Sequence, residues 1–129
     1  MNVKEIIETY YVHANNGDWM AWCDLFHENQ VMDEQLAGHI ESLATLREMM
    51  KGMGAAYASF QNHPKQILVD GNKAAVVSHI SARAAKYPDA PIEAEVMNYF
   101  EIADGKIKYM ANFHDSRPFK PFLDQISGS

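Results

Sequence analysis

The sequence predicts one α+β domain in which helices lie across one face of a curved antiparallel sheet. Apolar residues recur at helical spacing in the first half of the chain, alternate in the second half, and are separated by turn residues throughout. The 129 residues have the usual size of one domain, so we expect a single domain over residues 1–129. Hydrophobic residues make up 47% of the chain, which is typical of a folded globular protein rather than a disordered one.

Two helices are expected at the N-terminus. Apolar residues three and four apart over residues 3–14 predict the first helix, which Gly17 can end in a left-handed conformation. Asp18 can then cap a short, apolar second helix over residues 19–26. Both helices should bury one face against the sheet.

A third helix is expected after a short strand over residues 30–34 and an acidic turn. Ser42 is a suitable cap, and an apolar residue follows at every third or fourth position as far as Phe60. The sequence therefore predicts a helix that ends before Pro64.

The second half of the chain should form strands. A short strand over residues 66–69 leads into the turn Asp70-Gly71-Asn72, and a long segment over residues 74–87 ends at a proline-rich break, residues 88–91. Residues 92–102 alternate apolar and polar, which is typical of a half-buried strand. The turn Asp104-Gly105 precedes the last strand, residues 107–114, and a tail that forms a loop or short cap.

Charge and composition exclude several kinds of partner. The net charge is -6 and no basic cluster is present, so nucleic acids and anionic membranes are not expected to bind. The first residues lack the apolar core of a signal peptide, and no apolar run approaches the roughly 20 residues of a membrane span. The single Cys23 cannot form an internal disulfide, so we expect a cytoplasmic protein.

Four segments carry a resemblance to a known family. They are Tyr10–Asp18, Leu25–Asn29, Leu46–Glu48 and Asp104–Ile107, and their order and spacing resemble the ketosteroid isomerase and SnoaL-like polyketide cyclase group of the nuclear transport factor 2-like superfamily. The resemblance covers nearly the whole chain. It implies a cone-shaped half-barrel of a curved, mostly antiparallel sheet, with three N-terminal helices enclosing a pocket, and a homodimer formed through the outer sheet face.

The resemblance to the isomerase implies three catalytic positions. Tyr10 matches the tyrosine that holds the oxyanion, Glu34 or the adjacent Asp33 matches the general base, and Asn98 matches a protonated aspartic acid. In such a site a carboxylate removes a proton next to a carbonyl, and two donors stabilise the enolate oxygen.

Each of these positions also has a purely structural interpretation. Tyr10 lies on the apolar stripe of the first helix and could be a core residue, while Asp33 and Glu34 could belong to a solvated turn. Asn98 stands between apolar residues on one strand face, so its amide either satisfies a neighbour or lines a cavity.

The end of the last strand is a second candidate site. Phe113-His114-Asp115 resembles the aromatic-x-Asp ending of SnoaL-like cyclases, in which the aspartate acts as acid or base. Because neighbouring strand residues point to opposite faces, only one of His114 and Asp115 can enter the pocket. The apolar parity of the strand favours Asp115, whereas the isomerase register favours His114.

Further side chains are expected to contact a ligand. They are His79, His114, Trp22, Met53 and Phe100. The six histidines lack the spacing of metal ligands, and no phosphate-binding or nucleophile motif is present, so no metal or cofactor is expected.

The functional prediction is a cofactor-independent isomerase or a cyclase- or dehydratase-type lyase. It would act by acid/base proton transfer on a small, largely apolar carbonyl compound. The alternative is a non-catalytic binding module, or a dimeric structural or adaptor protein of the same fold, because one fold hosts many functions.

Overall fold

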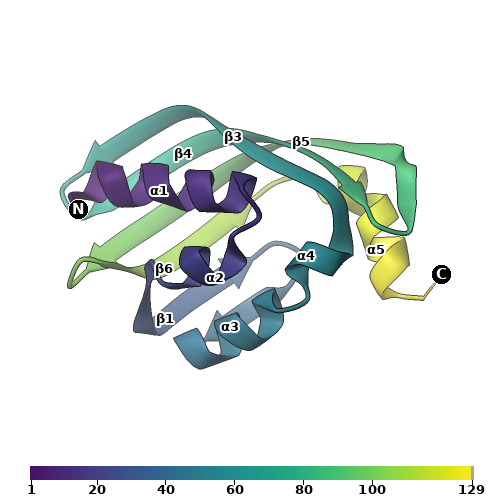
Figure 1. Cartoon of the computed structure of the whole chain (residues 1–129). Helices are drawn as coiled ribbons and strands as arrows, with labels where there is room; N and C mark the ends of the chain where they lie inside the picture. Colours follow the sequence, from purple (N-terminus) through teal and green to yellow (C-terminus); the bar gives the residue numbers. More distant parts are fainter. Residues whose placement is uncertain (129) are drawn as a thin grey trace.

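Six strands form one curved, open sheet with helices across its concave face (Figure 1). This computed structural model describes residues 1–128. The strand order is β2-β1-β6-β5-β4-β3, where β1 and β6 are parallel and the other neighbours are antiparallel. The strands are β1 (Phe26–Glu34), β2 (Gly38–Glu41), β3 (Tyr57–Asp70), β4 (Lys73–Ala84), β5 (Tyr87–Ala103) and β6 (Lys106–Phe113). The predicted fold class, a mostly antiparallel half-barrel with helices on one face, is confirmed.

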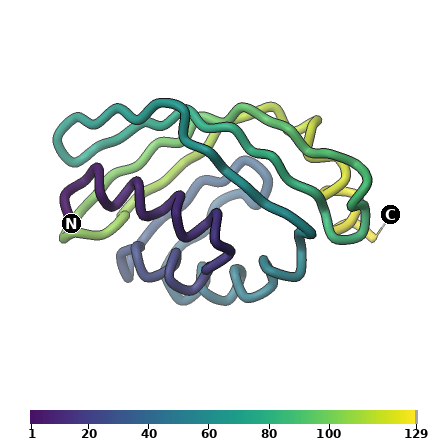
Figure 2. The backbone as a smooth tube through the Cα atoms, turned by 45° about the horizontal axis from the view of Figure 1, so that its top comes forward, coloured from purple at the N-terminus to yellow at the C-terminus, as the bar shows by residue number. Residues whose placement is uncertain are grey.

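Helices lie on the inner side of the curved sheet, as the backbone trace in Figure 2 shows. They are α1 (Val3–Asn15), α2 (Trp19–Cys23), α3 (Leu43–Met50), α4 (Met53–Ala56), the 3-10 turn η1 (Arg117–Phe119) and α5 (Lys120–Ile126). None of the helices in residues 1–128 has the length and apolar character needed to cross a bilayer.

Local capping explains why the first two helices begin and end where they do. Asn2 and Glu5 form a reciprocal capping box, in which the Asn2 side chain accepts from the Glu5 amide at 2.9 Å. Gly17 has a φ of +69°, and the Asp18 carboxylate accepts the Ala21 amide at 3.2 Å at the start of α2. The predicted first helix and both boundary residues are confirmed.

Two helix boundaries were predicted wrongly. The second helix stops at Cys23 instead of residue 26, because Phe26 begins β1 and pairs with Ile107 of β6. The third predicted helix is divided near Gly52, and its C-terminal part is strand: Tyr57 already pairs with Ala84. The N-terminal half therefore has four helices rather than three. It also contains β2, which was not predicted from the sequence.

The proline positions also differ from the prediction. Pro64 lies inside β3, at a register shift on an edge strand, where its missing N–H removes no central ladder bond. Residues 88–91 lie in β5 rather than in a break, and the chain turns at residues 85–86. Prolines are tolerated there because β5 pairs with β6 only from Met97 onward.

The two hairpin turns and the alternating strand are confirmed. Gly71 has a φ of +60°, and Asp104 and Gly105 have φ values of 55° and 73°, as a tight hairpin with matching twist requires. Even-numbered residues of β5 from Ile92 to Ile102 are buried on the concave face, where they meet the helices. This face forms one wall of the candidate site.

Candidate functional site

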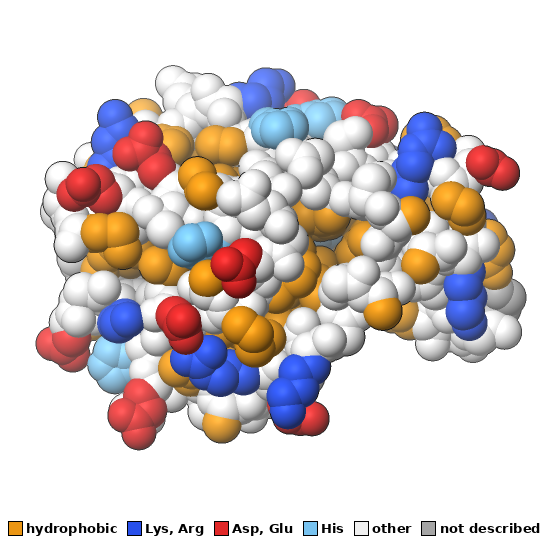
Figure 3. Space-filling model, viewed as in Figure 1, with side chains coloured by type: hydrophobic (Ala, Val, Ile, Leu, Met, Phe, Trp, Pro, Cys, Tyr) orange, Lys and Arg blue, Asp and Glu red, His pale blue; other side chains and the backbone are white. Residues whose placement is uncertain are grey.

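A cavity of about 420 Å³ lies between the concave face of the sheet and the helices. Figure 3 shows a hollow with apolar walls between the helical side of the molecule and its α5 end. Most lining side chains are aliphatic, aromatic or methionine, and Glu34 is the only acidic one. The polar side chains that line it belong to Tyr10, Glu34, Asn62, Asn98, Asn112 and His114. Such an apolar chamber with a few polar groups is typical of a small-molecule site.

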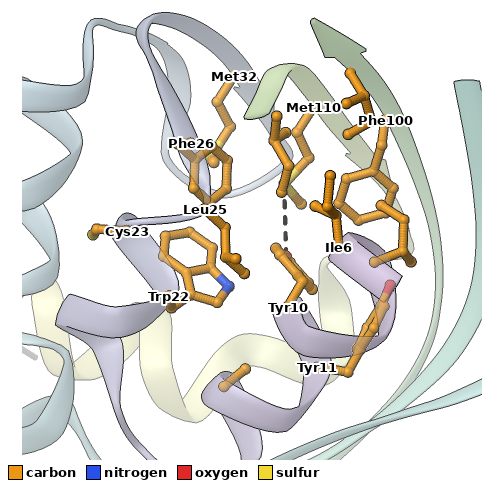
Figure 4. Close-up of a cluster of buried hydrophobic side chains, with 14 of the residues drawn as sticks. Ile6, Tyr10, Tyr11, Trp22, Cys23, Leu25, Phe26, Met32, Phe100 and Met110 are labelled. Carbon is orange, nitrogen blue, oxygen red and sulfur yellow. Dashed lines mark hydrogen bonds between the residues drawn. The ribbon is translucent and has the colours of Figure 1, made fainter. Parts of the chain in front are cut away.

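Tyr10 lies on the buried face of α1 and directs its hydroxyl toward β6 (Figure 4). The hydroxyl donates to the thioether of Met110 at 3.6 Å, which is a weak acceptor. Burial, followed by the negative charge of Glu34, raises the pKa of Tyr10 well above its ordinary value. The phenol therefore stays protonated and keeps a hydrogen available for a better acceptor.

Glu34 stands at the end of β1 and lines the cavity. One carboxylate oxygen accepts the backbone amides of Leu36, at 2.8 Å, and Ala37, and the other lies 3.4 Å from the Asn112 amide nitrogen. These donors fix the orientation of the carboxylate. Burial is the larger cause of the raised pKa of Tyr57, and the charge of Glu34 is the second, so Glu34 also acts electrostatically on a ring that packs against the lining residue Phe60.

Asp33 points to the opposite face of the sheet and does not line the cavity. It is exposed, lies 2.6 Å from His39 and accepts a 2.6 Å hydrogen bond from the Tyr109 hydroxyl. Those hydrogen bonds, with the one from Tyr109 as the largest cause, lower the pKa of Asp33. Strand alternation thus gives the two adjacent carboxylates different surroundings.

Asn98 lies on β5 at the cavity wall and is 1% exposed. Its amide nitrogen donates to the hydroxyl of Ser78 at 2.9 Å and to the carbonyl of Val76 at 3.4 Å, both on β4. The sequence left open whether Asn98 lines the cavity or satisfies a neighbour, and in the structure it does both. Because both amide hydrogens are engaged, Asn98 does not offer the oxyanion donor that the isomerase resemblance implied.

At the end of β6 the structure brings His114 to the cavity and not Asp115. The His114 ring packs on Phe119, with ring centroids 4.7 Å apart, and its Nδ1 lies 2.8 Å from the Asp115 carbonyl oxygen. Asp115 instead forms a bidentate pair with the exposed Arg117, which lowers the pKa of Asp115 to about 2. A carboxylate held in this way outside the cavity is not placed to exchange protons with a bound ligand.

Of the other expected ligand contacts, Trp22 and Met53 line the cavity, whereas His79 and Phe100 do not. His79 lies on the outer sheet face because its neighbours Ser78 and Ile80 point inward. Its two ring nitrogens lie 2.7 Å from Glu93 and 2.8 Å from Glu95. Phe100 is fully buried and packs against the Tyr10 ring, with ring centroids 5.1 Å apart, so it belongs to the hydrophobic core instead.

The contribution of Asn62 to the wall was not predicted from the sequence. The sequence pattern places Asn62 between a helix and a strand, but β3 puts it in the cavity wall, 6% exposed. A polar amide that follows Tyr57 and Phe60 was the available signal, and it became informative only once the segment was known to be a strand.

No group of potential metal ligands is found in residues 1–128.

Comparison with known proteins identifies the family. Residues 7–110 match the model of the SnoaL-like domain, so the chain belongs to the SnoaL-like domain family. This confirms the resemblance drawn from the sequence. No curated protein sequence shows a significant match.

Solved structures share the fold at low sequence identity. An LEH-like epoxide hydrolase from M. tuberculosis has a TM-score of 0.78 at 14% identity, over 98% of this chain and 96% of that one. The epoxide hydrolase/cyclase-like enzyme SalBIII, described for its role in pyran ring formation in the polyether salinomycin, has a TM-score of 0.76 at 24% identity. The match covers 88% of this chain and 90% of that one. A Catenulispora acidiphila protein with a ketosteroid isomerase-like fold, in complex with trimethylamine, has a TM-score of 0.76 at 10% identity, over 84% of each chain.

Proposed function

We propose that the protein is a cofactor-independent enzyme that transfers a proton on a small, largely apolar carbonyl compound. The observation that carries the proposal is the position of Glu34, the only acidic side chain of the described residues that lines an apolar cavity, next to which the Tyr10 hydroxyl also lies. A carboxylate in such surroundings is a suitable general base, because a partly desolvated base is not masked by water.

Each residue has a definite role in this reaction. Glu34 removes a proton from the carbon next to the carbonyl, and the electron pair of the broken C–H bond moves to the carbonyl oxygen. The hydroxyl of Tyr10 donates to the enolate oxygen that forms, and this bond replaces the weak bond to Met110. In a β,γ-unsaturated ketone the enolate is a conjugated dienolate, and return of the proton to its γ carbon gives the isomerised, α,β-unsaturated ketone.

The structural relatives support an enzyme without identifying its substrate. Two of them are described as an epoxide hydrolase and as an epoxide hydrolase/cyclase-like enzyme, so this fold accommodates chemistry on small molecules. At their identities the likeness concerns the fold, and the roles of Glu34 and Tyr10 rest on the position of these side chains in the cavity.

The proposal is tested by proton exchange on a model ketone, 2-tetralone, followed in D2O by NMR. The protein should accelerate exchange next to the carbonyl, and Glu34→Gln should lower that rate by about 10²-fold or more, because the amide is not a base. Asp33→Asn is the matched control, since it changes the adjacent carboxylate on the other sheet face, and it should leave the rate unchanged. Equal rates for both variants would contradict the role of Glu34.

One observation favours the second candidate, a non-catalytic binding module. The amide hydrogens of Asn98 are engaged by Ser78 and Val76, so the second oxyanion donor of the isomerase pattern is missing. A binding module would take up 2-tetralone without exchanging its protons. Both tryptophans of the chain, Trp19 and Trp22, line the cavity, so intrinsic fluorescence reports binding separately from exchange.

We also propose that two copies pair through the outer face of the sheet. Met97 and Phe113 are partners in the β5–β6 register and are 43% and 57% exposed, so an apolar surface is available there. The size of the particle in solution tests this proposal.

A further inference from the structure

Four buried side-chain atoms of residues 1–128 make no hydrogen bond of good geometry within the chain: the Tyr11 hydroxyl, Trp22 Nε1, Gln30 Oε1 and Asn62 Oδ1. Two of these atoms, on Trp22 and Asn62, belong to residues that line the cavity. Trp22 is 5% exposed and Asn62 is 6% exposed. A buried polar group without a partner costs stability, so such groups in the wall of a cavity indicate the polar groups of a ligand.

Trp22 supplies a donor next to a second donor. Its ring lies beside that of Tyr10, with centroids 5.4 Å apart, and Figure 4 shows the indole nitrogen on the side that faces Tyr10. An indole N–H only donates, and the Tyr10 hydroxyl has only the thioether of Met110 as its acceptor. Burial and then the charge of Glu34 raise the pKa of Tyr10, whereas the nearby Trp22 N–H lowers it, so the two side chains form one donor pair. Such a pair suits one oxygen acceptor, such as a carbonyl.

Asn62 supplies the complementary group on another wall. Its backbone is fixed to α1, because its N–H donates to Asn15 Oδ1 at 2.6 Å and its carbonyl accepts from Asn15 Nδ2 at 3.0 Å. The side-chain oxygen Oδ1 makes no hydrogen bond within the chain. A half-turn of the terminal torsion presents either end of the amide to the cavity, and its oxygen can accept a hydroxyl hydrogen.

The remaining wall restricts the ligand further. Among residues 1–128 no lysine or arginine lines the cavity, and Glu34 would repel an anion. The aromatic rings of Trp19, Phe60 and Phe122 also line it, among aliphatic and methionine side chains. The wall therefore suits an uncharged ring compound.

We propose that the cavity binds an uncharged ring compound with two separate polar groups: a carbonyl oxygen held by Trp22 and Tyr10, and a hydroxyl held by Asn62. The identity of the carbonyl rests on the proposed function, since it is the group next to which Glu34 removes a proton. The hydroxyl on Asn62 is a specificity contact that proton transfer itself does not require.

Calorimetric titration with four naphthalenes tests this proposal: 6-acetyl-2-naphthol, 2-acetylnaphthalene, 2-naphthol and 2-ethylnaphthalene. The unmodified protein should bind the first most tightly, and each polar group should raise affinity about tenfold, as one good buried hydrogen bond does. Equal affinities for all four compounds, or no binding of any, would overturn the proposal without a substitution that could disturb folding.

Variants assign each polar group to its partner. Asn62→Leu should abolish the advantage of the hydroxyl and keep that of the acetyl group, whereas Trp22→Phe should reduce only the advantage of the acetyl group. Tyr109→Phe, which removes an aromatic hydroxyl on the outer sheet face, is the control and should change neither. A hydroxyl advantage that persists in Asn62→Leu would overturn the assignment.

The same titration on Glu34→Gln separates this proposal from the proposed function. The order of affinities should be kept when the base is removed. A preserved order in a protein without proton-transfer activity would leave the binding proposal standing and reject the enzyme. Proton transfer without any preference among the naphthalenes would reject the binding proposal and leave the enzyme proposal standing.

Discussion

Replacing Asn98 distinguishes a donor to the substrate from a structural group in the cavity wall. Asn98→Leu keeps the size of the side chain but removes its bonds to Ser78 and Val76. The bond at 2.9 Å is the stronger one, and the Ser78 hydroxyl, fully buried, is left without this partner. Loss of the bonds together with an unpaired buried group should lower the free energy of unfolding by about 2 kcal/mol.

Two measurements on the Asn98→Leu protein test this expected loss of stability: its Tm and its proton-exchange rate. For a domain of this size, about 2 kcal/mol corresponds to a fall of roughly 6–10 °C in Tm, measured by circular dichroism. The proton-exchange rate on 2-tetralone, measured well below both transitions, should change by less than about threefold, because the amide hydrogens do not reach the substrate.

Ser78→Ala is the matched control. It removes the same hydrogen bond from its other end, at a residue that does not line the cavity, so it should lower Tm by a similar amount. A fall in exchange of about 10²-fold in Asn98→Leu but not in Ser78→Ala would refute this reasoning. It would show that Asn98 donates to the substrate, as the isomerase resemblance implied.

Three further predictions concern other groups. Tyr10→Phe should lower the exchange rate by about 10²-fold and barely change Tm, since the hydroxyl has only a thioether partner; an unchanged rate would remove Tyr10 from the reaction. Light scattering should give a particle of twice 14.6 kDa for the unmodified chain and a monomer for Met97→Glu, and a monomeric unmodified chain would contradict pairing. The pKa of His79 is raised above 6.5 by hydrogen bonds to Glu93 and then to Glu95, so its stabilising contribution is full below that pH and is lost as pH rises through the raised pKa. An NMR titration should show the raised value and its return toward 6.5 in the double variant Glu93→Gln, Glu95→Gln, and an ordinary value in the unmodified protein would argue against these bonds.

Features that depend on neighbouring residues were predictable from the sequence. The turn at Asp104-Gly105 needs two residues that tolerate positive φ, and both occur where the alternation of β5 ends. Asp18 likewise caps α2 through a residue only three positions away. In these cases the stabilising contacts are local, so the sequence pattern already contains them.

Features that depend on pairing between distant segments were not predictable in the same way. The apolar spacing through Tyr57 and Phe60 fits a helix, but β4 is available beside the segment and pairs with it from Ala84 onward. The backbone hydrogen bonds of a sheet outweigh a modest helical pattern, which Gly52 and Gly54 interrupt.

The same limit applies to the candidate site. Whether Glu34 or Asp33 faces the cavity depends on the register of β1 against β6, in which Asp33 pairs with Ala111. The engagement of the Asn98 amide depends on Ser78, on the neighbouring strand. The polar groups of the wall could therefore be named from the sequence, but which of their hydrogens are free could not.

The most direct test of the central claim, that Glu34 is a general base within an apolar cavity, uses 5-nitrobenzisoxazole. Removal of its carbon-bound proton breaks the ring N–O bond and releases a coloured phenolate, so the initial rate measures proton abstraction alone. The account predicts a rate for the unmodified protein at least about 10² times that of Glu34→Gln, measured at equal protein concentration and pH. Equal rates for the two proteins would contradict it.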